Sequence, residues 1–437
     1  MLTFKDASPA PVAAPSSTGW RAPTLLAAAA WTLSGVLVYL LAPRAAPFLL
    51  PLSFLAPLIA HWAHNGRVRW QPPSAAFVAL GLAALYLLVN CSWSLSPKAA
   101  YSEIGCLGLF IAALYATVAV LGVAEAPLLH AMAAGFVAAM LVGGAFLCFE
   151  TFSGQAVHRL MLAHFPSLTP PLGHLHMEGQ RVVFLEPHLL NRSMTALTLL
   201  VWPAALAING LALSARRKRL LLLGLVLIVA AIFRSQHGTS KLALIGAAAT
   251  YGVCLLAPSS TRRLVIAAWI AATLLVAPLA SLAYAKQLYL ASWLPRTAGM
   301  RIVIWGYTSS QLQSAPLLGA GISSARVLGH SDDDHPVFAP GSDFRVTTGW
   351  HSHNGYLQTW FEAGGVGVAL LLVFGLLVLR SVAGSPAAVR PYLYATFVSC
   401  AVMANSSFSL WAPWFLASFC FAAVFAVLGA ELAARPR

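Results

Sequence analysis

The chain has 437 residues, of which 59% are hydrophobic and only 9% are charged, and its mean hydropathy is +0.78. Soluble proteins carry about 25% charged residues, so this composition excludes an ordinary soluble protein. A transmembrane β-barrel is excluded too, because its strands would alternate apolar and polar residues, whereas the runs here are apolar on every side. The composition therefore predicts an all-α polytopic membrane protein.

The net charge of +14 comes from 26 basic and 12 acidic residues. In a membrane protein the location of these charges matters more than their sum, so we expect membrane lipid and no nucleic acid as a partner. The six cysteines lie in or at the ends of apolar runs. They indicate small core residues rather than a disulfide framework or a zinc site.

Apolar runs of helical length follow one another along the chain. Since a hydrocarbon core about 30 Å thick takes roughly 20 residues per helix, they predict about 12 transmembrane helices. The expected spans are 22–42, 46–62, 75–93, 102–123, 128–150, 192–213, 220–233, 239–257, 264–284, 356–379, 391–410 and 412–431.

The distribution of charge predicts the orientation. With the N-terminus inside, the short cytoplasmic segments hold many Lys and Arg residues and few acids, as the positive-inside rule requires. The two long segments then face the periplasm, where long loops are usually functional. The expected parts are a disordered cytoplasmic tail (1–21), transmembrane helices 1–9 (22–284) with a periplasmic loop (151–191), a large periplasmic loop (285–355), transmembrane helices 10–12 (356–431) and a second cytoplasmic tail (432–437).

Four arginines lie on the predicted outer side at or beyond the ends of spans: Arg192, Arg234, Arg296 and Arg301. One such arginine could simply extend to the membrane surface. As a group, with few acids near them in sequence, they are typical of a pyrophosphate site, because guanidinium binds phosphate oxygens through two parallel hydrogen bonds. Lys241 is a further candidate, and Arg192 could act together with the free N–H groups of its helix N-terminus.

The segment His351-Ser-His-Asn-Gly-Tyr356 stands where the large loop enters the tenth span. The helix dipole and nearby arginines disfavour a charged histidine there, so the ring should be neutral near pH 7 and able to accept a proton. The alternative is an interfacial histidine that only caps the helix or bonds a loop carbonyl.

Metal sites are a rival interpretation. Residues 332–335 (Asp-Asp-Asp-His) could bind a metal ion, although successive acids in a loop are more often a solvated turn. The pairs His351 with His353 and His174 with His176 could bind zinc, but each lacks a third ligand at suitable spacing.

Several short motifs together resemble the bacterial O-antigen ligase family, within a wider group that includes O-antigen polymerases and protein O-oligosaccharyltransferases. They occur in the family's order between about residues 185 and 380. The motifs are Asn191-Arg192, Arg234-Ser235, Arg301-Ile-Val-Ile-Trp305, Pro316-Leu-Leu-Gly-Ala-Gly321, His353-Asn354-Gly355-Tyr356-Leu357 and Glu362-Ala-Gly-Gly-Val-Gly367.

The resemblance implies a GT-C-like inner-membrane glycosyltransferase with its active site in the periplasm and both termini in the cytoplasm. It would transfer a glycan from undecaprenyl pyrophosphate to a lipid A-core sugar, with inversion and without a metal ion or cofactor. The family's essential histidine matches His353, as general base, and its essential arginines match Arg234 and Arg301. Further residues could bind pyrophosphate or support the site; they are Arg192, Lys241, His351, Asn191, Asn354, Tyr356 and Trp305.

Other functions remain open at this stage. A polymerase would use the same donor with a different acceptor, and a protein O-oligosaccharyltransferase is a third possibility. A transporter of lipid-linked sugars or anionic solutes would carry charges near the middle of several spans, whereas the spans here are nearly free of them. The sequence does not indicate the oligomeric state.

Overall fold

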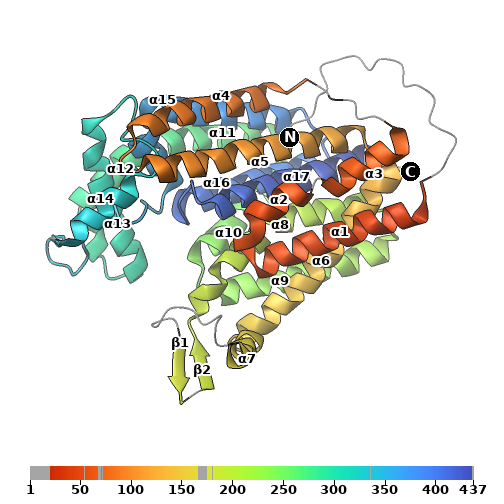
Figure 1. The fold of residues 1–437 in the computed structure, drawn as a ribbon, viewed down its shortest axis with the longest axis horizontal. Helices are drawn as coiled ribbons and strands as arrows, with labels where there is room; N and C mark the ends of the chain where they lie inside the picture. The colour runs from red at the N-terminus through yellow and green to blue at the C-terminus, as the bar shows by residue number, and fades with distance from the viewer. Residues whose placement is uncertain are drawn as a thin grey trace.

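The computed structural model describes residues 20–53, 55–66, 70, 72–165, 175–179, 181–334 and 336–435, and the chain is almost entirely helical there. Most helices run along the long axis of the molecule (Figure 1). The apolar runs form helices because a helix satisfies every backbone polar group within its own segment. The main helices are α1 (Ala22–Leu41), α2 (Ala46–Ser53), α3 (Leu55–Asn65), α4 (Ala75–Asn90), α5 (Pro97–Val123), α6 (Ala126–Phe152), α8 (Asn191–Gly210), α9 (Ala215–Arg234), α10 (Gly238–Leu256), α11 (Pro258–Leu274), α12 (Val276–Ala285), α15 (Gly355–Ala383), α16 (Arg390–Ser406) and α17 (Pro413–Ala434).

Within the described ranges, nine helical segments are long and apolar enough to cross a membrane, and α11 with α12, bent by 62°, would make a tenth. The protein is therefore a polytopic membrane protein, as predicted. Each of the expected spans coincides with a helix or a helix pair. Two of the expected spans are not among these ten segments. They are α9, which begins with the basic run 216–219, and α16, which has only 17 residues.

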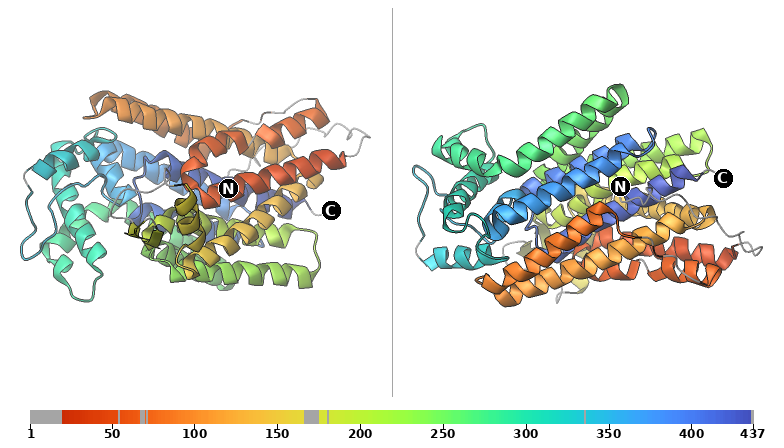
Figure 2. Two further views of the ribbon diagram at one scale, coloured as in Figure 1. Left: turned by 60° about the horizontal axis from the view of Figure 1, so that its bottom comes forward. Right: turned by 90° about the horizontal axis from the view of Figure 1, so that it is seen from above.

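The large loop predicted at 285–355 contains helices and gathers at one end of the molecule, in all three views (Figures 1 and 2). It holds η5 (Leu288–Leu290), α13 (Arg296–Gln311), η6 (Leu312–Ser314) and α14 (Ser324–Asp334). Tyr289 and Val303 are buried in a small core of this segment, separate from the core of the bundle.

A short β-hairpin departs from the all-α prediction. Between α6 and α8, the described residues form α7 (Ala156–His164), β1 (Leu175–Glu178), β2 (Arg181–Leu185) and η4 (Pro187–Leu190). The two strands are antiparallel, with Leu175 opposite Leu185, and lie with α7 beside the bundle (Figure 1). The run Val182-Val-Phe184 favours a strand, and Gly179 at the turn has a φ of +62° that suits glycine.

The centre of the bundle is α8 packed against α17. The most hydrophobic part of α8 is 83% buried, more than in any other candidate span. Small residues allow this close packing: a Cβ on Gly429 of α17 would lie 2.8 Å from the Leu206 side chain of α8. Aromatic stacking joins α6 to the same helix α17, with the rings of Phe136 and Phe425 4.0 Å apart.

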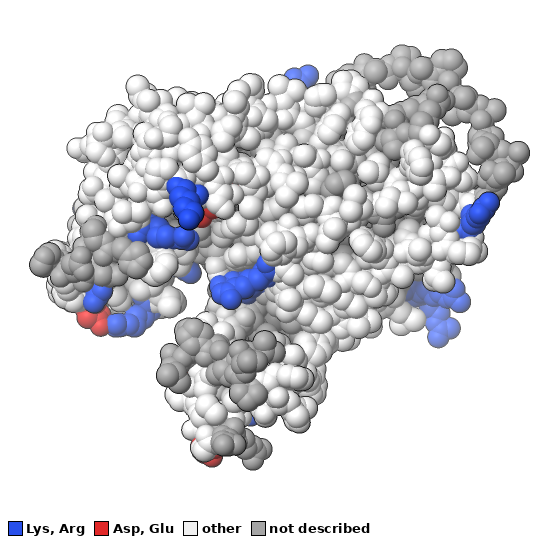
Figure 3. All heavy atoms as spheres, in the orientation of Figure 1, with Lys and Arg blue, Asp and Glu red and all other residues white. Residues whose placement is uncertain are grey.

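Charged side chains are rare over the middle of the molecule. In Figure 3 the visible Lys and Arg side chains lie mostly toward the two ends, and the surface between them is nearly uncharged. Such a band is what a hydrocarbon core requires, because charge at its centre is costly. The end that carries α13 and α14 is called the loop end below, and the other is called the opposite end.

Helix α15 is broken at Gly364, and the 316–321 segment fills the break. Gly364 has φ +62° and ψ −167°, a conformation open essentially to glycine alone. The backbone N–H groups of Gly365 and Val366 donate to the carbonyls of Pro316 and Leu317, at 2.9 and 3.1 Å. This pairing explains the two glycine-containing motifs, because the segments must approach with their backbones in contact.

We expect Gly364→Ala to lower the free energy of unfolding by about 2 kcal/mol or more. The alanine Cβ would lie 2.4 Å from the carbonyl oxygen of Leu317, in a backbone conformation that alanine avoids. Thermal unfolding in detergent measures the effect. Gly81→Ala in α4, where a Cβ meets nothing within 4 Å, is the control; equal melting of the two variants would contradict this account.

Candidate active site

His353 lies directly before α15, in a backbone conformation that is strained for a histidine. Its φ is +53°, in the left-handed region, which costs a non-glycine residue about 1–3 kcal/mol. The next residue, Asn354, caps α15: its side-chain oxygen accepts hydrogen bonds from the backbone N–H groups of Tyr356 and Leu357, both at 3.1 Å. The imidazole Nδ1 lies 3.0 Å from the backbone carbonyl oxygen of Ser407. These contacts fix the direction of the ring.

The Ser407 contact determines which ring nitrogen of His353 carries the proton. A carbonyl oxygen can only accept, so Nδ1 donates and the lone pair of the neutral ring is on Nε2. Burial is the main cause that lowers the pKa of His353; the Ser407 carbonyl opposes it, and the charge of Arg301 adds to it. The ring is therefore neutral near pH 7, and burial is the largest cause of the lowered pKa.

His351 packs against His353, with the ring centroids 4.0 Å apart. Burial lowers its pKa to about 3, and the neighbouring His353 adds to the shift. Its Nε2 is buried and has no hydrogen-bond partner. An unpaired buried polar atom costs about 1–3 kcal/mol, so a ligand that bonded it would recover that cost.

Arg301 comes to this site from α13, in the segment at the loop end. Its Nη1 donates to the hydroxyl of Ser406 at 3.3 Å. One turn later, Trp305 Nε1 donates to the backbone carbonyl of Ser352 at 2.8 Å, which ties α13 to the histidine segment. Burial lowers the pKa of Arg301, but an arginine stays charged, so a cation is held beside a neutral imidazole.

Residues 406–408, at the end of α16, join these elements to α10. The Ser406 carbonyl accepts from the Thr239 hydroxyl at 2.6 Å, and the Ser407 hydroxyl lies 3.4 Å from His237 Nε2. His237 Nδ1 is in turn 2.7 Å from the Ser240 hydroxyl. Burial lowers the pKa of His237 to about 4, with the charge of Arg301 adding to the shift, so this third histidine is also neutral.

Arg192 comes to this region from the start of α8 and lies over the Phe408 ring. Its guanidinium carbon lies 5.9 Å from the Phe408 ring centre and 5.6 Å from that of Trp414. Its Nε is buried without a hydrogen-bond partner, as is Oδ1 of the neighbouring Asn191. Arg44, which the sequence analysis did not select, is close enough to interact electrostatically with Arg192. No carboxylate neutralises this pair among the described residues.

The remaining predicted site residues are Arg234, Lys241 and Tyr356. Arg234 is exposed at the end of α9 and Lys241 is half-buried in the first turn of α10, on either side of His237 in sequence. Neither has a hydrogen-bond or ion-pair partner within the described part of the chain. Tyr356 is buried in the core, where its hydroxyl donates to the Ala401 carbonyl at 2.9 Å, so its contacts stabilise the helix packing.

Arg296 does not belong with the other arginines. It pairs with Asp343 at 2.5 Å and lies over the Phe344 ring, with the two charged side chains largely exposed. The sequence grouping was wrong for this residue, because Asp343 is distant in sequence but adjacent in space. Glu362 takes no part in pairing arginine either: it is fully buried and accepts from Ala325 N, Gln358 and Trp411.

The metal hypotheses fall largely outside the described residues. His174 and His335 lie in undescribed segments, and nothing is described of the side chains of Asp332, Asp333 and Asp334. Among the residues that the structure describes, no three His, Cys, Asp or Glu side chains lie where they could share a metal ion.

Some residues near the histidines carried no recognisable signal in the sequence. Ser406 and Ser407 each contribute a hydroxyl and a backbone carbonyl, and any residue possesses the carbonyl. Arg326, in α14, lies over the Trp350 ring at 5.9 Å and acts electrostatically on His351. Its partner is in a different part of the long segment, so only the fold brings the two together.

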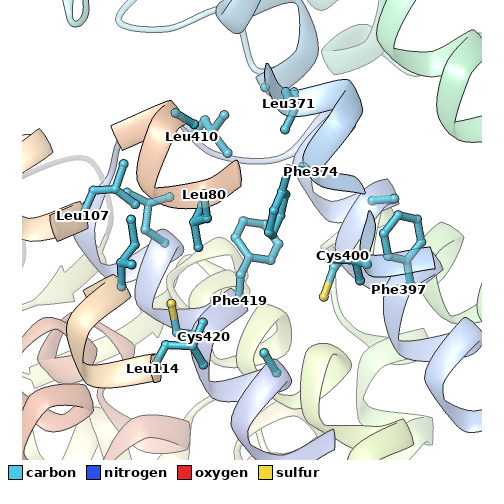
Figure 4. A pocket seen from close by; sticks show the side chains of 18 of the residues that line it. Leu80, Leu107, Leu114, Leu371, Phe374, Phe397, Cys400, Leu410, Phe419 and Cys420 are labelled. Atoms are coloured by element: carbon cyan, nitrogen blue, oxygen red, sulfur yellow. The ribbon is translucent and has the colours of Figure 1, made fainter. Parts of the chain in front are cut away.

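An apolar cavity of about 330 Å³ lies between α4, α5, α15, α16 and α17. Figure 4 shows Phe374, Phe397 and Phe419 lining it from three different helices. Part of its lining, Gly355 and Leu410, comes from the two segments that adjoin His353 and Ser407. The cavity therefore reaches from the membrane-spanning helices to the level of the histidines.

Comparison with known proteins finds a family match over part of the chain. Residues 202–372 match the family described as O-antigen ligase. This confirms the resemblance seen in the sequence. A curated protein of Rickettsia conorii, named "putative polysaccharide ligase", is 24% identical over 123 residues. That alignment covers 28% of this chain and 29% of the relative, so it extends over a minor part of both proteins.

The O-antigen ligase match contains Arg234, Lys241, Arg301 and His353. Arg192 and residues 406–408 lie outside it, before and after the matched segment. The site geometry thus extends beyond the matched segment into α8 and into the connection between α16 and α17.

Acid should destabilise the protein between about pH 6.5 and pH 4. A histidine in the unfolded chain has a pKa near 6.5, whereas that of His237 is about 4 in the folded protein. The unfolded state therefore binds more protons in this window, and the free energy of unfolding falls with falling pH by up to about 1.4 kcal/mol per unit for each such histidine.

Apparent melting temperatures measured against pH in detergent test this dependence. His237→Gln should give a smaller loss of stability between pH 6.5 and 4 than the parent protein. His164→Gln, on the exposed surface of α7, is the control. An unchanged pH dependence in His237→Gln would show that this histidine does not titrate as described.

Proposed function

We propose that the protein is a glycosyltransferase of the O-antigen ligase type. It transfers a glycan from undecaprenyl pyrophosphate to a hydroxyl of a lipid A-core sugar. The observation that carries the proposal is the unprotonated Nε2 of a neutral His353 next to Arg301, a cation that has no carboxylate partner among the residues that the structure describes. This combination suits a reaction that removes a proton and neutralises a departing diphosphate.

The proposed chemistry needs one base and several cations. Nε2 of His353 accepts the proton of the acceptor hydroxyl as its oxygen bonds to the anomeric carbon of the donor. The bond from that carbon to the pyrophosphate oxygen breaks, and its electron pair leaves with the pyrophosphate. Attack from the face opposite the leaving group inverts the anomeric configuration. Pyrophosphate is a good leaving group, so the step requires neither a strong general acid nor a metal ion.

The cationic side chains have separate parts in this proposal. Arg301 binds the diphosphate nearest to His353, and Arg192, which lies over the Phe408 ring, also binds it. Arg234 and Lys241 are further pyrophosphate ligands. His351, whose Nε2 is unpaired, contacts the acceptor hydroxyl, while Asn191, Asn354 and Trp305 support the site. His237 and Ser407 act as positioning residues.

The apolar cavity beside Gly355 is the proposed site for the polyprenyl chain of the donor. Its lining is almost entirely hydrocarbon, which suits an isoprenoid chain and does not suit a polar ligand. Its position next to His353 would let a lipid tail remain among the helices while the diphosphate reaches the arginines. We also propose that the loop end faces the periplasm of the inner membrane and that both termini are cytoplasmic, in accord with the basic run 216–219 at the opposite end.

His353→Ala should lower the turnover number about 10²- to 10⁴-fold, because a positioned general base contributes that much. The test uses purified protein, undecaprenyl-pyrophosphate-linked glycan and lipid A-core, with a chelator and without nucleotide. His188→Ala, on the exposed surface of η4, is the matched control. Full turnover by His353→Ala, or product from the parent protein only after metal addition, would contradict the mechanism.

Arg301→Lys should lower kcat/KM about tenfold or more. Lysine keeps the charge but cannot form the paired hydrogen bonds of guanidinium with phosphate oxygens. Arg296→Lys, on the same helix, should leave kcat/KM near the parent value because Arg296 is paired with Asp343. The same assay measures both variants, and equal losses would indicate a general effect on α13 rather than a role at the site.

A further inference from the structure

A second cluster of arginines lies at the opposite end of the bundle, away from His353. Arg262 and Arg263 of α11 and Arg390 of α16 line a cavity of about 690 Å³. The remaining lining residues are Pro258, Ser259, Ile266, Ala383 and Tyr394. Since α15 begins next to His353 and ends at Ala383, the length of that helix separates the two sites.

Two polar atoms of this cavity have no hydrogen-bond partner among the residues that the structure describes. One is the hydroxyl of Tyr394, whose side chain has no exposed surface. The other is the buried Nε of Arg390, although Nη2 of the same residue donates to the Ser385 carbonyl at 2.9 Å. An unpaired buried polar group destabilises the protein, and a ligand with acceptor oxygens would remove that cost.

The lining has three arginines and no acid. Arg262 and Arg263 make no hydrogen bond or ion pair in the part of the chain that the structure describes. Helices α11 and α16 both begin at this cavity, with Pro258 and Arg390 as their first residues, so the positive ends of two helix dipoles border it. Guanidinium groups, helix N-termini and a tyrosine hydroxyl together suit phosphate oxygens.

The surroundings resemble the surface of a membrane rather than open water. Leu256, at the end of α10, is 88% exposed, and Leu264 of α11 is 61% exposed. Apolar side chains this exposed next to arginines are usual where hydrocarbon meets phospholipid headgroups. Basic pockets between helices at the cytoplasmic surface bind anionic headgroups in this way.

We propose that this cavity binds a phosphate group at the membrane surface, separate from the glycan-transfer site. Arg262, Arg263 and Arg390 bind the phosphate oxygens, and the Tyr394 hydroxyl donates to one of them. The bound group links α11 to α16. The exposed leucines favour an anionic phospholipid over free phosphate as its source.

Native mass spectrometry of the full-length protein in detergent, with phosphatidylglycerol or phosphatidylcholine added, tests the proposal. The pocket variant Arg262→Gln/Arg263→Gln should retain phosphatidylglycerol at least about tenfold less than the parent, because each lost charge-assisted hydrogen bond costs about 1.5–3 kcal/mol. The control variant Arg216→Gln/Arg217→Gln removes the same charge from α9 and should retain phosphatidylglycerol like the parent. Tyr394→Phe should show a smaller loss than the pocket variant.

A second arm identifies the source of the phosphate. Melting temperatures are measured with inorganic phosphate and with phosphatidylglycerol, for the parent and the pocket variant. If phosphatidylglycerol alone raises the melting temperature, and this increase is lost in the pocket variant, the bound group is a lipid headgroup. If inorganic phosphate also raises the melting temperature of the parent, the site binds a soluble anion. Equal retention by the pocket variant and the parent, or equal loss in the α9 control, would overturn the proposal.

Discussion

The hydrogen bond from His353 Nδ1 to the Ser407 carbonyl is the interaction on which the rest of the site depends. It joins the start of α15 to the connection between α16 and α17, two segments more than 50 residues apart. It also keeps the ring proton on Nδ1, so that the lone pair of Nε2 remains free to accept a proton. Ser406 and Ser407 also receive contacts from Arg301, Thr239 and His237. Four elements therefore meet at one short connection, and a displacement of that connection would change the direction of the imidazole and the position of the nearest cation together.

The membrane-spanning helices also hold this arrangement in place. Asn354 caps α15, and further along this helix residues 361, 362, 365 and 366, on both sides of the break at Gly364, form backbone hydrogen bonds with the 316–321 segment. The break in α15 thus ties the segment at the loop end to the bundle, near the histidines. Because the helices themselves are nearly free of charge, the cations collect mostly at the two ends of the molecule. The two phosphate sites proposed above, one at each end, are in accord with that distribution.

The sequence predicted the helical membrane fold well, because long apolar runs leave the backbone no alternative in a hydrocarbon environment. It also selected His353, Arg301 and Trp305, which the fold brings to one place. It was wrong about Arg296, whose partner Asp343 is 47 residues away, and it missed Ser406, Ser407 and Arg44. Backbone carbonyls carry no residue signature, and pairings between distant segments follow from tertiary packing. The β-hairpin was missed because two strands of four and five residues are too short for a periodic pattern to stand out.

The most direct test of the central claim is a structure of the protein bound to undecaprenyl pyrophosphate in a lipid nanodisc. The account predicts diphosphate density at the loop end, in contact with the Arg301 guanidinium and on the Nε2 side of His353, with the lipid chain entering the apolar cavity beside Gly355. Diphosphate bound elsewhere, with Arg301 still on Ser406 and no phosphate near His353, would contradict it.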